Sequence, residues 1–204
     1  MNILILSPYP EGLLPALRES SDQYMICTDP ITSQFFEAES FDYLICYGYR
    51  YMIRRDILDL FPGKAINLHI SLLPYSRGSH PVFWSIIDGK PLGVTIHALD
   101  DGLDTGNILF QQVTPLCLDK NESFFTLYLK MRNSIELLFE HSWKYLRTSE
   151  CSGWKQQGLP TFHRSRELED WLHLMPLKWN TSISDFCKIA RVTHPLVSVV
   201  QPKP

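Results

Sequence analysis

Long apolar runs and clustered basic residues are both missing from this sequence of 204 residues. No apolar run approaches the roughly 20 residues that a transmembrane helix needs, so we expect no membrane span. The apolar start, Met1 to Leu6, lacks a basic region and is soon broken by Pro8 and Pro10, so it predicts a first strand and not a signal peptide. The 19 Lys and Arg residues are scattered among 22 Asp and Glu residues, and the net charge of −3 argues against a nucleic-acid partner.

Cysteine is also scarce. The five cysteines are odd in number, lie far apart, and form neither a CxxC pair nor a zinc-binding spacing. Cys27 and Cys46 fall in apolar runs, where small buried thiols are common. We therefore expect no bound metal and a reducing, cytoplasmic location.

The composition that remains is that of a globular protein, with 45% hydrophobic and 20% charged residues. Apolar runs alternate with helical stretches, which predicts an α/β fold with a Rossmann-like, mostly parallel sheet flanked by helices. The runs lack polar alternation, as expected for strands that are covered on both faces. The expected strands are Asn2–Leu6, Tyr24–Cys27, Tyr43–Tyr47, Ala65–Ile70, Gly93–Leu99 and Asn107–Thr114, and the expected shorter helices are Gly12–Ser20, Arg54–Leu60 and Pro81–Asp88.

The longest helical signal follows Asp119, which would cap the helix together with Glu122. Apolar residues then recur at the spacing of an amphipathic helix, at Phe124, Tyr128, Met131, Ile135 and Leu138. From Cys151 onward the pattern changes to short helical pieces, such as Ser182–Val192, separated by Gly and Pro. We predict one domain over residues 1–150 and a short helical and irregular C-terminal extension over residues 151–204 that packs on it.

Asn67 and His69 are the first polar pair that suggests chemistry. They lie two residues apart near the end of an expected strand, so their side chains point to the same face. The carboxyl ends of parallel strands border the crevice where such sheets bind ligands. An amide donor beside an imidazole suits an oxygen that gains negative charge, although a hydrogen-bonded polar pair at a strand end is the simpler interpretation.

A polar loop, Asp100 to Gly106, follows the next apolar strand. Such a loop can return a carboxylate to the same crevice, where it would orient the imidazole of His69 and raise its basicity. Taken alone, the loop reads equally as a solvated acidic turn in which glycine adopts positive φ.

Three ordered motifs resemble the folate-dependent formyltransferase family. They are Asn67-Leu68-His69-Ile70-Ser71-Leu72-Leu73-Pro74-Tyr75-Ser76-Arg77-Gly78, then Gly93-Val94-Thr95-Ile96-His97, then Leu103-Asp104-Thr105-Gly106. The resemblance covers roughly residues 1–146. It implies the formyltransferase fold and an enzyme that transfers a formyl group from N10-formyl-tetrahydrofolate to an amine.

The resemblance also implies catalytic roles. Asn67 and His69 would hold and polarise the formyl oxygen, and Asp104 would pair with His69 and help to remove the proton from the attacking amine. His97 reads as a support for the site loop or as a core histidine. No metal is needed, and no side chain lies in a recognisable nucleophile motif.

The loop after the third strand resembles the segment that lines the family's pterin pocket, and the backbone of Leu99 to Gly102 would complete that pocket. An ordinary strand-exit turn is the alternative. The implied residues for binding N10-formyl-tetrahydrofolate are Tyr47, Gly48, Tyr49, Tyr51, Met52, Ile53, Leu99, Asp100, Asp101 and Gly102.

Three classes of amine acceptor compete within this family. Methionyl-tRNA formyltransferases carry an additional C-terminal barrel for tRNA, for which we expect no room in this length. Glycinamide ribonucleotide transformylases follow their first strand with a loop rich in glycine and serine that cradles a phosphate. Here Pro8 and Pro10 remove N–H donors from that loop and Glu11 adds a repelling charge, which argues against the purine pathway.

Nucleotide-sugar N-formyltransferases remain as the preferred group. Residues Arg77 to Ser85 and Thr161 to Leu168 are similar to stretches of the small bacterial members. The implied acceptor is the amine of a UDP- or dTDP-linked amino-deoxy sugar used for a bacterial surface glycan such as lipopolysaccharide, and a homodimer stays open. The residues expected to bind it are Tyr75, Arg77, Gly78, His80, Trp84 and Arg164.

Two other classes are kept. A non-catalytic folate-binding relative would keep the site without turnover, but the intact set of Asn67, His69 and Asp104 argues against decay. A formyl-tetrahydrofolate hydrolase would use water in place of the amine, and such enzymes usually carry an added N-terminal regulatory domain. A first strand that begins directly after Met1 favours the transferase.

Overall fold

The computed structural model describes residues 1–115, 122–148 and 153–193. Contacts between Cα atoms group the chain into two compact units. The first unit contains Met1–His69, Thr95–Gln111 and the described part of Ile135–Gln157. The second unit contains Ile70–Val94 and the described parts of Gln112–Ser134 and Gly158–Pro204. The division at residue 150 that the sequence suggests stays a prediction, as does a homodimer.

The main sheet has six strands in the order β2-β1-β3-β4-β6-β7. The pairs β1–β2, β1–β3 and β3–β4 are parallel, and β4–β6 is antiparallel. The mostly parallel α/β sheet predicted from the sequence is therefore confirmed; the direction of β6 is not readable, because a strand buried on both faces has the same apolar pattern either way. The strands are β1 (Asn2–Leu6), β2 (Gln23–Cys27), β3 (Tyr43–Tyr47), β4 (Ala65–His69), β6 (Gly93–Ala98) and β7 (Ile108–Val113).

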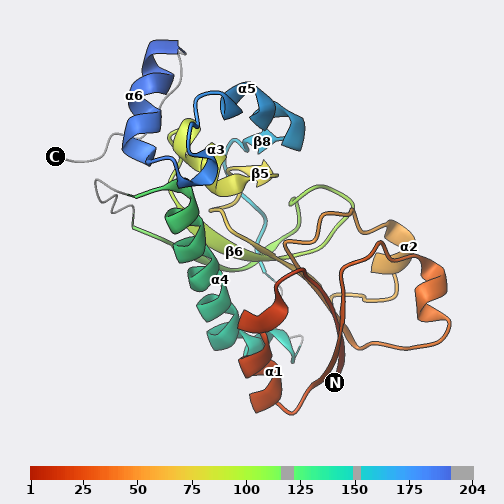
Figure 1. Ribbon diagram of the computed structural model, residues 1–204. Coiled ribbons are helices and arrows are strands. Elements are labelled where there is room, and N and C mark those ends of the chain that lie inside the picture. Colours follow the sequence, from red (N-terminus) through yellow and green to blue (C-terminus); the bar gives the residue numbers. More distant parts are fainter. Residues whose placement is uncertain (116–121, 149–152, 194–204) are drawn as a thin grey trace. The chain divides into compact units, whose positions relative to one another are not determined.

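Helices flank this sheet at the expected places (Figure 1). The helices expected at four places before residue 150 and near the C-terminus are present, within a few residues of their expected ends. The α-helices are α1 (Leu14–Glu19), α2 (Arg55–Leu58), α3 (Pro81–Ile87), α4 (Phe124–Leu146), α5 (Glu169–Leu172) and α6 (Ile183–Thr193), and the 3-10 turns are η1 (Pro10–Gly12), η2 (Ser33–Phe36), η3 (Ser165–Leu168) and η4 (Lys178–Asn180). None of the helices among the described residues is long and apolar enough to cross a membrane.

The start of α4 is capped by a residue that the sequence analysis did not choose. Ser123 Oγ accepts a hydrogen bond from Thr126 N at 3.1 Å, and Ser123 N donates to Thr126 Oγ1 at 3.0 Å. The buried carboxylate of Glu122 contacts the Thr126 hydroxyl and the Lys130 ammonium. Asp119 lies outside the described residues. The cap is therefore the local Ser–Thr pair, whose hydroxyls meet the first free N–H groups of the helix.

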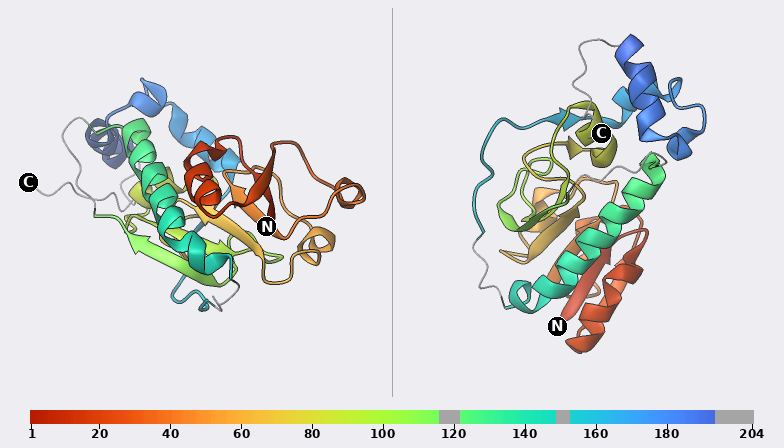
Figure 2. Two further views of the ribbon diagram at one scale, coloured as in Figure 1. Left: turned by 90° about the horizontal axis from the view of Figure 1, so that it is seen from below. Right: turned by 90° about the vertical axis from the view of Figure 1, so that its left-hand side faces the viewer.

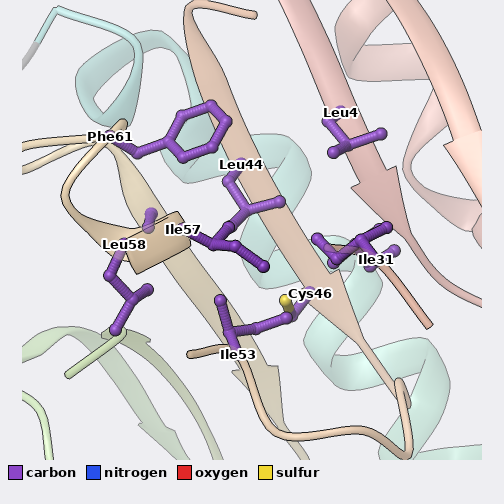
Figure 3. Close-up of a cluster of buried hydrophobic side chains, with 10 residues drawn as sticks. Leu4, Ile31, Leu44, Cys46, Ile53, Ile57, Leu58 and Phe61 are labelled. Carbon is purple, nitrogen blue, oxygen red and sulfur yellow. The ribbon is translucent and has the colours of Figure 1, made fainter. Parts of the chain in front are cut away.

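In the first unit, α2 covers one face of the sheet, and α1 and the C-terminal half of α4 lie next to each other on the opposite face (Figures 1 and 2). Strand residues alternate between these faces. Leu44 and Cys46 of β3 point to the α2 face, where they pack with Ile57 (Figure 3). Tyr43 and Tyr47 point to the α4 face, where Tyr43 packs edge-on against Trp143 and the Tyr47 hydroxyl donates to Glu136 at 2.9 Å.

A buried carboxylate ties the edge of this unit together. Asp22 has a fully buried side chain that accepts hydrogen bonds from the N-terminal ammonium of Met1, from Trp143 Nε1 and from Arg147. Burial opposes ionisation, but the hydrogen bonds from Arg147, the N-terminus and Trp143 outweigh it and lower the pKa of Asp22. The carboxylate is thus a structural anchor.

The second unit contains an aromatic core. Phe83 of α3, Phe124 of α4 and Phe186 of α6 pack with ring centroids 5.1–5.6 Å apart. A short parallel pair, β5 (Arg77–Gly78) and β8 (Phe162–His163), forms a separate sheet beside α3 (Figure 1). This pair joins two segments that are far apart in the sequence.

Candidate active site

Asn67 and His69 point to the same face of the sheet, as their spacing predicts, and this is the face that α2 covers. In the strand register Leu6 pairs with Cys46, Cys46 with Asn67, and Asn67 with His97, so these side chains share one face. The apolar cluster of Figure 3 therefore continues, one strand further, into a polar group of Asn67, His69 and His97. Both histidines are buried.

Asp104 joins this group from the loop after β6. Its Oδ2 lies 3.6 Å from His69 Nδ1, and its Oδ1 lies 3.4 Å from His97 Nε2 and accepts a hydrogen bond from Asn67 Nδ2 at 3.1 Å. Only 9% of the surface of Asp104 is exposed, so its carboxyl group has little contact with water. The loop thus returns a carboxylate to the strand residues, and the solvated-turn interpretation does not describe it.

The conformation of this loop needs particular residues. Asp104 itself has φ of +53°. A side chain at Gly106 would place its Cβ 1.8 Å from the carbonyl oxygen of Ala98, so only glycine fits there. Asp100 closes the near end of the loop, because its Oδ1 accepts from Gly102 N at 3.1 Å and from Thr105 Oγ1 at 2.6 Å. These contacts fix where the carboxylate points.

His97 is a member of the cluster and not a separate core histidine. Its Nδ1 lies 2.8 Å from the carbonyl oxygen of Ala98, which can only accept, so Nδ1 carries a proton. Its Nε2 faces Asn67 Nδ2 at 3.2 Å as well as Asp104. His97 therefore helps to set the orientation of the Asn67 amide, which agrees with the supporting role expected from the sequence.

The cluster has the chemistry of a site that stabilises negative charge and moves a proton. An amide donor and an imidazole lie side by side, and a buried carboxylate orients the imidazole. Cys46, next to Asn67 in the register, is unsuited to act as a nucleophile because burial raises the pKa of its thiol. Within residues 1–115, 122–148 and 153–193, no group of three or more His, Cys, Asp or Glu side chains could hold a metal ion.

Three of the residues expected to bind the folate come together beside this cluster. Ile53 is part of the apolar cluster on the α2 face, and Tyr49 and Leu99 pack against it. The Tyr49 hydroxyl donates to the carbonyl oxygen of Asp29 at 2.7 Å, and burial raises the pKa of Tyr49 to about 12. Tyr51 and Met52 are exposed beside them, with 42% and 57% of their surface accessible.

The remaining expected folate-binding residues lie differently. The side chain of Tyr47 points to the α4 face, away from Asn67 and His69, so only backbone atoms of Tyr47 could contact a folate beside these residues. Gly48 has φ of +64° and no space for a side chain, because a Cβ there would overlap the ring of Tyr9. Asp101 forms an exposed ion pair with Arg55 at 3.0 Å, while Asp100 and Gly102 belong to the site loop.

The residues expected to bind the acceptor all belong to the second unit. Arg77 and Gly78 form β5, Tyr75 lies under the Lys90 ammonium, and exposed His80 stacks on Trp179 with ring centroids 5.4 Å apart. Trp84 is buried, and its ring stacks on His163. Exposed Arg164 follows β8 and packs its guanidinium over Phe162.

Two residues at these sites were missed in the sequence. Gln156 Nε2 donates to the carbonyl oxygens of Asp104 and Gly106 at 2.8 and 2.9 Å, so it fixes the site loop. His163 contacts Asp88 and Glu167. Gln156 lies in no motif, and His163 lies in the stretch from Thr161 to Leu168 without a spacing that marks it as a site residue, so only a contact between distant segments reveals their roles.

Known proteins resemble this chain in sequence and in fold. A sequence model of the formyl transferase family matches residues 27–138. The methionyl-tRNA formyltransferase of Syntrophus aciditrophicus is 30% identical over 169 residues, which cover 82% of this chain and 52% of that protein. The methionyl-tRNA formyltransferase of Clostridioides difficile is 34% identical over 167 residues, which cover 80% of this chain and 49% of that protein. The chain thus spans about half the length of the two curated relatives.

Solved structures cover more of the chain. The formyltransferase PseJ from Anoxybacillus kamchatkensis, in complex with UDP-4,6-dideoxy-4-formamido-L-AltNAc and tetrahydrofolate, is 34% identical and superposes with a TM-score of 0.85 over 91% of this chain and 97% of that chain. A sugar N-formyltransferase from Shewanella shares the fold, with a TM-score of 0.72 at 17% identity over 84% of this chain and 80% of that chain. The matched residues and the likeness to PseJ over almost its full length show that this chain belongs to the formyl transferase family.

Proposed function

We propose that this protein transfers a formyl group from N10-formyl-tetrahydrofolate to the amine of a nucleotide-linked amino-deoxy sugar, for the synthesis of a bacterial surface glycan. The proposal rests on the buried cluster of Asn67, His69 and Asp104, in a chain that matches 97% of the length of PseJ. The PseJ structure is a complex with a UDP-linked 4-formamido sugar and tetrahydrofolate, which makes a UDP-linked 4-amino sugar the leading acceptor.

The cluster has a role for each member in this reaction. The amine nitrogen attacks the formyl carbon, and the formyl oxygen gains negative charge. Protonated His69 donates a hydrogen bond to that oxygen, the Asn67 amide turns one N–H from Asp104 to the same oxygen, and the Asp104 carboxylate holds the charged imidazole. The Asp104 carboxylate, the unprotonated member of the pair, takes one proton from the amine and passes it to the N10 nitrogen as the bond from the formyl carbon to N10 breaks, so that the formamide and tetrahydrofolate are formed. The proposed reaction uses no metal and no covalent enzyme intermediate.

The first loop argues against glycinamide ribonucleotide as the acceptor. A Cβ at Gly12 would lie 2.4 Å from Glu136 Oε2, so a carboxylate fills the space beside this loop. Glu11 adds a second negative charge, and Pro8 and Pro10 lack N–H donors. A loop that holds a phosphate needs free N–H groups and no carboxylates. This loop therefore disfavours the phosphate of glycinamide ribonucleotide.

Methionyl-tRNA is the second candidate acceptor, because the curated relatives named above are methionyl-tRNA formyltransferases. The net charge of −3 gives no electrostatic footprint for tRNA. The PseJ structure matches 91% of this chain and 97% of its own, a wider coverage than that of the curated relatives, and this favours the sugar.

A panel assay tests the proposal. The full chain is incubated with N10-formyl-tetrahydrofolate and, in turn, UDP- and dTDP-linked 4-amino and 3-amino sugars, glycinamide ribonucleotide, methionyl-tRNA and buffer alone. Mass spectrometry then records a gain of one formyl group, and a second assay records free formate. We expect the gain on a nucleotide sugar, at the same rate with and without EDTA. Formylation of methionyl-tRNA or glycinamide ribonucleotide alone, or formate release without acceptor, would overturn the proposal.

A folate-binding control separates the acceptor from the co-substrate. A stable folate analogue should bind to the full chain even where no acceptor is modified. If the analogue binds and no acceptor in the panel is formylated, the sugar assignment fails and a folate-binding relative without turnover is the better description. If the analogue does not bind, the assignment of the folate site fails as well.

A further inference from the structure

His163 of β8 is held by an unusually complete set of partners in the second unit. Its ring stacks flat on the ring of Trp84, with centroids 3.8 Å apart and an angle of 6° between the planes. Its Nε2 lies 2.9 Å from Asp88 Oδ2, and its Nδ1 lies 3.0 Å from Glu167 Oε2. Since ionised carboxylates only accept hydrogen bonds, both ring nitrogens donate, and the ring is a cationic imidazolium.

The surroundings of the ring favour this charged form. Burial disfavours the cation, but the hydrogen bonds to Asp88 and Glu167 outweigh burial and raise the pKa of His163. Stacking on an indole adds a favourable cation–π contact. Asp88 is the residue that ends α3, and Glu167 lies in η3, so the imidazolium joins α3 to η3 through β8.

The backbone of β8 is fastened to β5 at the same place. Gly78 pairs with His163, and Ser79 N donates to the carbonyl oxygen of His163 at 3.1 Å. A Cβ at Gly78 would lie 2.4 Å from that oxygen, and Gly78 has φ of +89°, so no other residue fits without a shift. Arg77 N donates to the carbonyl oxygen of Thr161 at 3.0 Å. The two strands therefore have one register.

Alternation along β8 places its neighbours on the opposite face from His163. Phe162 and Arg164 flank His163 in extended backbone, so their side chains point away from Trp84. Arg77 pairs with Phe162 across the strands and so shares its face. The Arg164 guanidinium lies 5.9 Å from the centre of the Phe162 ring, and Phe162 is 43% exposed.

This face carries an exposed aromatic ring with the Arg164 guanidinium over it, and Arg77 stands at the paired position of the neighbouring strand. Guanidinium groups bind phosphate oxygens in bidentate fashion, and an aromatic ring stacks on a planar base. A nucleoside diphosphate presents both a base and two phosphates. Phe162 lies in the stretch from Thr161 to Leu168 that the sequence singles out, but it is absent from the expected binding residues, because nothing in its spacing marks it.

We propose that Arg77, Phe162 and Arg164 bind the nucleoside diphosphate of the acceptor, and that His163 is the positioning residue that holds this face in place. The inference rests on the proposed function for the identity of the nucleotide, and it assigns the nucleotide to one face of β5 and β8. Loss of the proton from His163 removes a hydrogen bond to one carboxylate and leaves Asp88 and Glu167 as unneutralised charges beneath the strand. Nucleotide binding should therefore weaken as the pH rises.

Binding of UDP and dTDP by the full chain tests this inference without turnover. Isothermal titration between pH 5.5 and pH 9 gives the Kd of the wild type and of His163→Gln, Asp88→Asn, Phe162→Leu and the control His173→Gln, which changes an exposed histidine of the same unit. We expect the wild-type Kd to rise about tenfold across this range. His163→Gln should bind about tenfold more weakly than the wild type at pH 6 and lose the pH dependence. His173→Gln should match the wild type.

Asp88→Asn distinguishes positioning from simple damage to the fold. It keeps the size of the side chain and removes one charge that favours the imidazolium, so the midpoint of the pH dependence should move to lower pH. Phe162→Leu should weaken UDP binding at every pH without moving that midpoint. Circular dichroism and thermal unfolding of each variant show whether it is folded, and a variant that does not fold is replaced by Glu167→Gln, for which the same shift is expected.

The outcomes separate this inference from the proposed function. If UDP binds as described and no sugar is formylated, the acceptor assignment fails and the nucleotide face stands. If an amino sugar is formylated but UDP binds equally well to the wild type, His163→Gln and Phe162→Leu, the proposed function stands and this inference is overturned. Absence of UDP and dTDP binding to the wild type at millimolar concentration also overturns it. Once an acceptor is found, His163→Gln should raise the KM for that acceptor and leave kcat and the KM for the folate unchanged.

Discussion

The two units of this molecule hold their polar side chains in different ways. In the first unit, Asn67, His69 and His97 are carried by neighbouring strands, whose backbone ladder fixes them whatever their side chains do. In the second unit, the side chains of His163 and Asp88 are themselves the fastening between segments 75 residues apart. Polar side chains on the strands of the first unit are therefore available for catalysis, whereas His163 and Asp88 in the second unit hold their neighbours in place.

The difference has a physical origin. A strand buried between two layers is positioned by backbone hydrogen bonds and apolar packing, so one polar side chain adds little to its stability. A strand of two residues such as β8 has too few ladder bonds to hold itself, and side-chain contacts must supply the rest. Function in the first unit and structure in the second should therefore respond differently to substitution.

The largest effect should come from the catalytic cluster. Replacing Asn67, His69 or Asp104 singly by Ala should lower kcat by on the order of 100-fold or more, because each substitution removes a group that acts on the charge formed in the transition state. The fold should persist because the strand ladder remains. Formyl transfer to the acceptor found in the panel assay measures the loss. Double variants should lose less than the product of the single losses, since the residues act as a unit. Near wild-type turnover of any two single variants would refute the assignment.

Two buried carboxylates of the first unit sharpen the comparison. Asp22→Asn should lower the free energy of unfolding by about 3 kcal/mol, because Arg147 and the N-terminal ammonium lose their buried partner. Its kcat should stay unchanged below the unfolding temperature. Asp104→Asn should do the reverse, with a large loss of kcat and a small change in stability. Chemical denaturation gives the free energy of unfolding of both variants, and a turnover assay gives their kcat. Asp59→Asn, which changes an exposed carboxylate, is the control. Equal losses of stability in both would show that Asp104 is a structural carboxylate.

The sequence is informative where neighbours in the chain make the structure. The strands of the first unit are readable because each is a short apolar run between turn residues, and α4 is readable from its repeat of apolar positions. The cluster of Asn67, His69 and Asp104 can be predicted from the sequence because two members lie two residues apart on one strand, and the third lies in a loop rich in glycine. The family motifs add the order of these pieces.

The rest depends on contacts between distant residues. Gln156 lies 52 residues from the Asp104 carbonyl oxygen that it contacts, and His163 lies 75 residues from Asp88. A single glutamine or histidine has no periodicity, so its partner stays hidden until the chain is folded. The antiparallel direction of β6 is hidden for a related reason, since burial on both faces leaves no pattern that distinguishes the two directions.

Gln156 provides an intermediate test of the comparison, because it is a side-chain fastening inside the first unit. Gln156→Ala removes two hydrogen bonds, to the carbonyl oxygens of Asp104 and Gly106. The site loop should then sample positions in which the Asp104 carboxylate is misplaced, and kcat should fall about tenfold, which corresponds to about 1.4 kcal/mol. The neighbouring exposed residue provides the control, Gln157→Ala. An unchanged kcat would mean that the strand residues and Asp100 position the loop without Gln156.

The last effect, close in size to that of Gln156→Ala, should appear in the pH dependence of stability, where the contributions of His163 and Asp22 change in opposite directions. The pKa of His163 is raised in the folded protein, so its contribution is complete below the ordinary histidine pKa of about 6.5 and is lost as the pH rises through the raised value. The pKa of Asp22 is lowered, so its contribution is complete above the ordinary value of 3.8 and is lost as the pH falls through the lowered value. Urea denaturation of the wild type and His163→Gln should therefore differ by about 1.5 kcal/mol at pH 6, because the lost hydrogen bonds are those of a charged group, and the two should converge as the pH rises through the raised pKa of His163. Asp22→Asn should converge with the wild type only in strong acid. If His163→Gln differs from the wild type by the same amount at pH 6 and pH 9, the ring is neutral in the fold, and the contacts with Asp88 and Glu167 do not fasten the second unit as a charged pair.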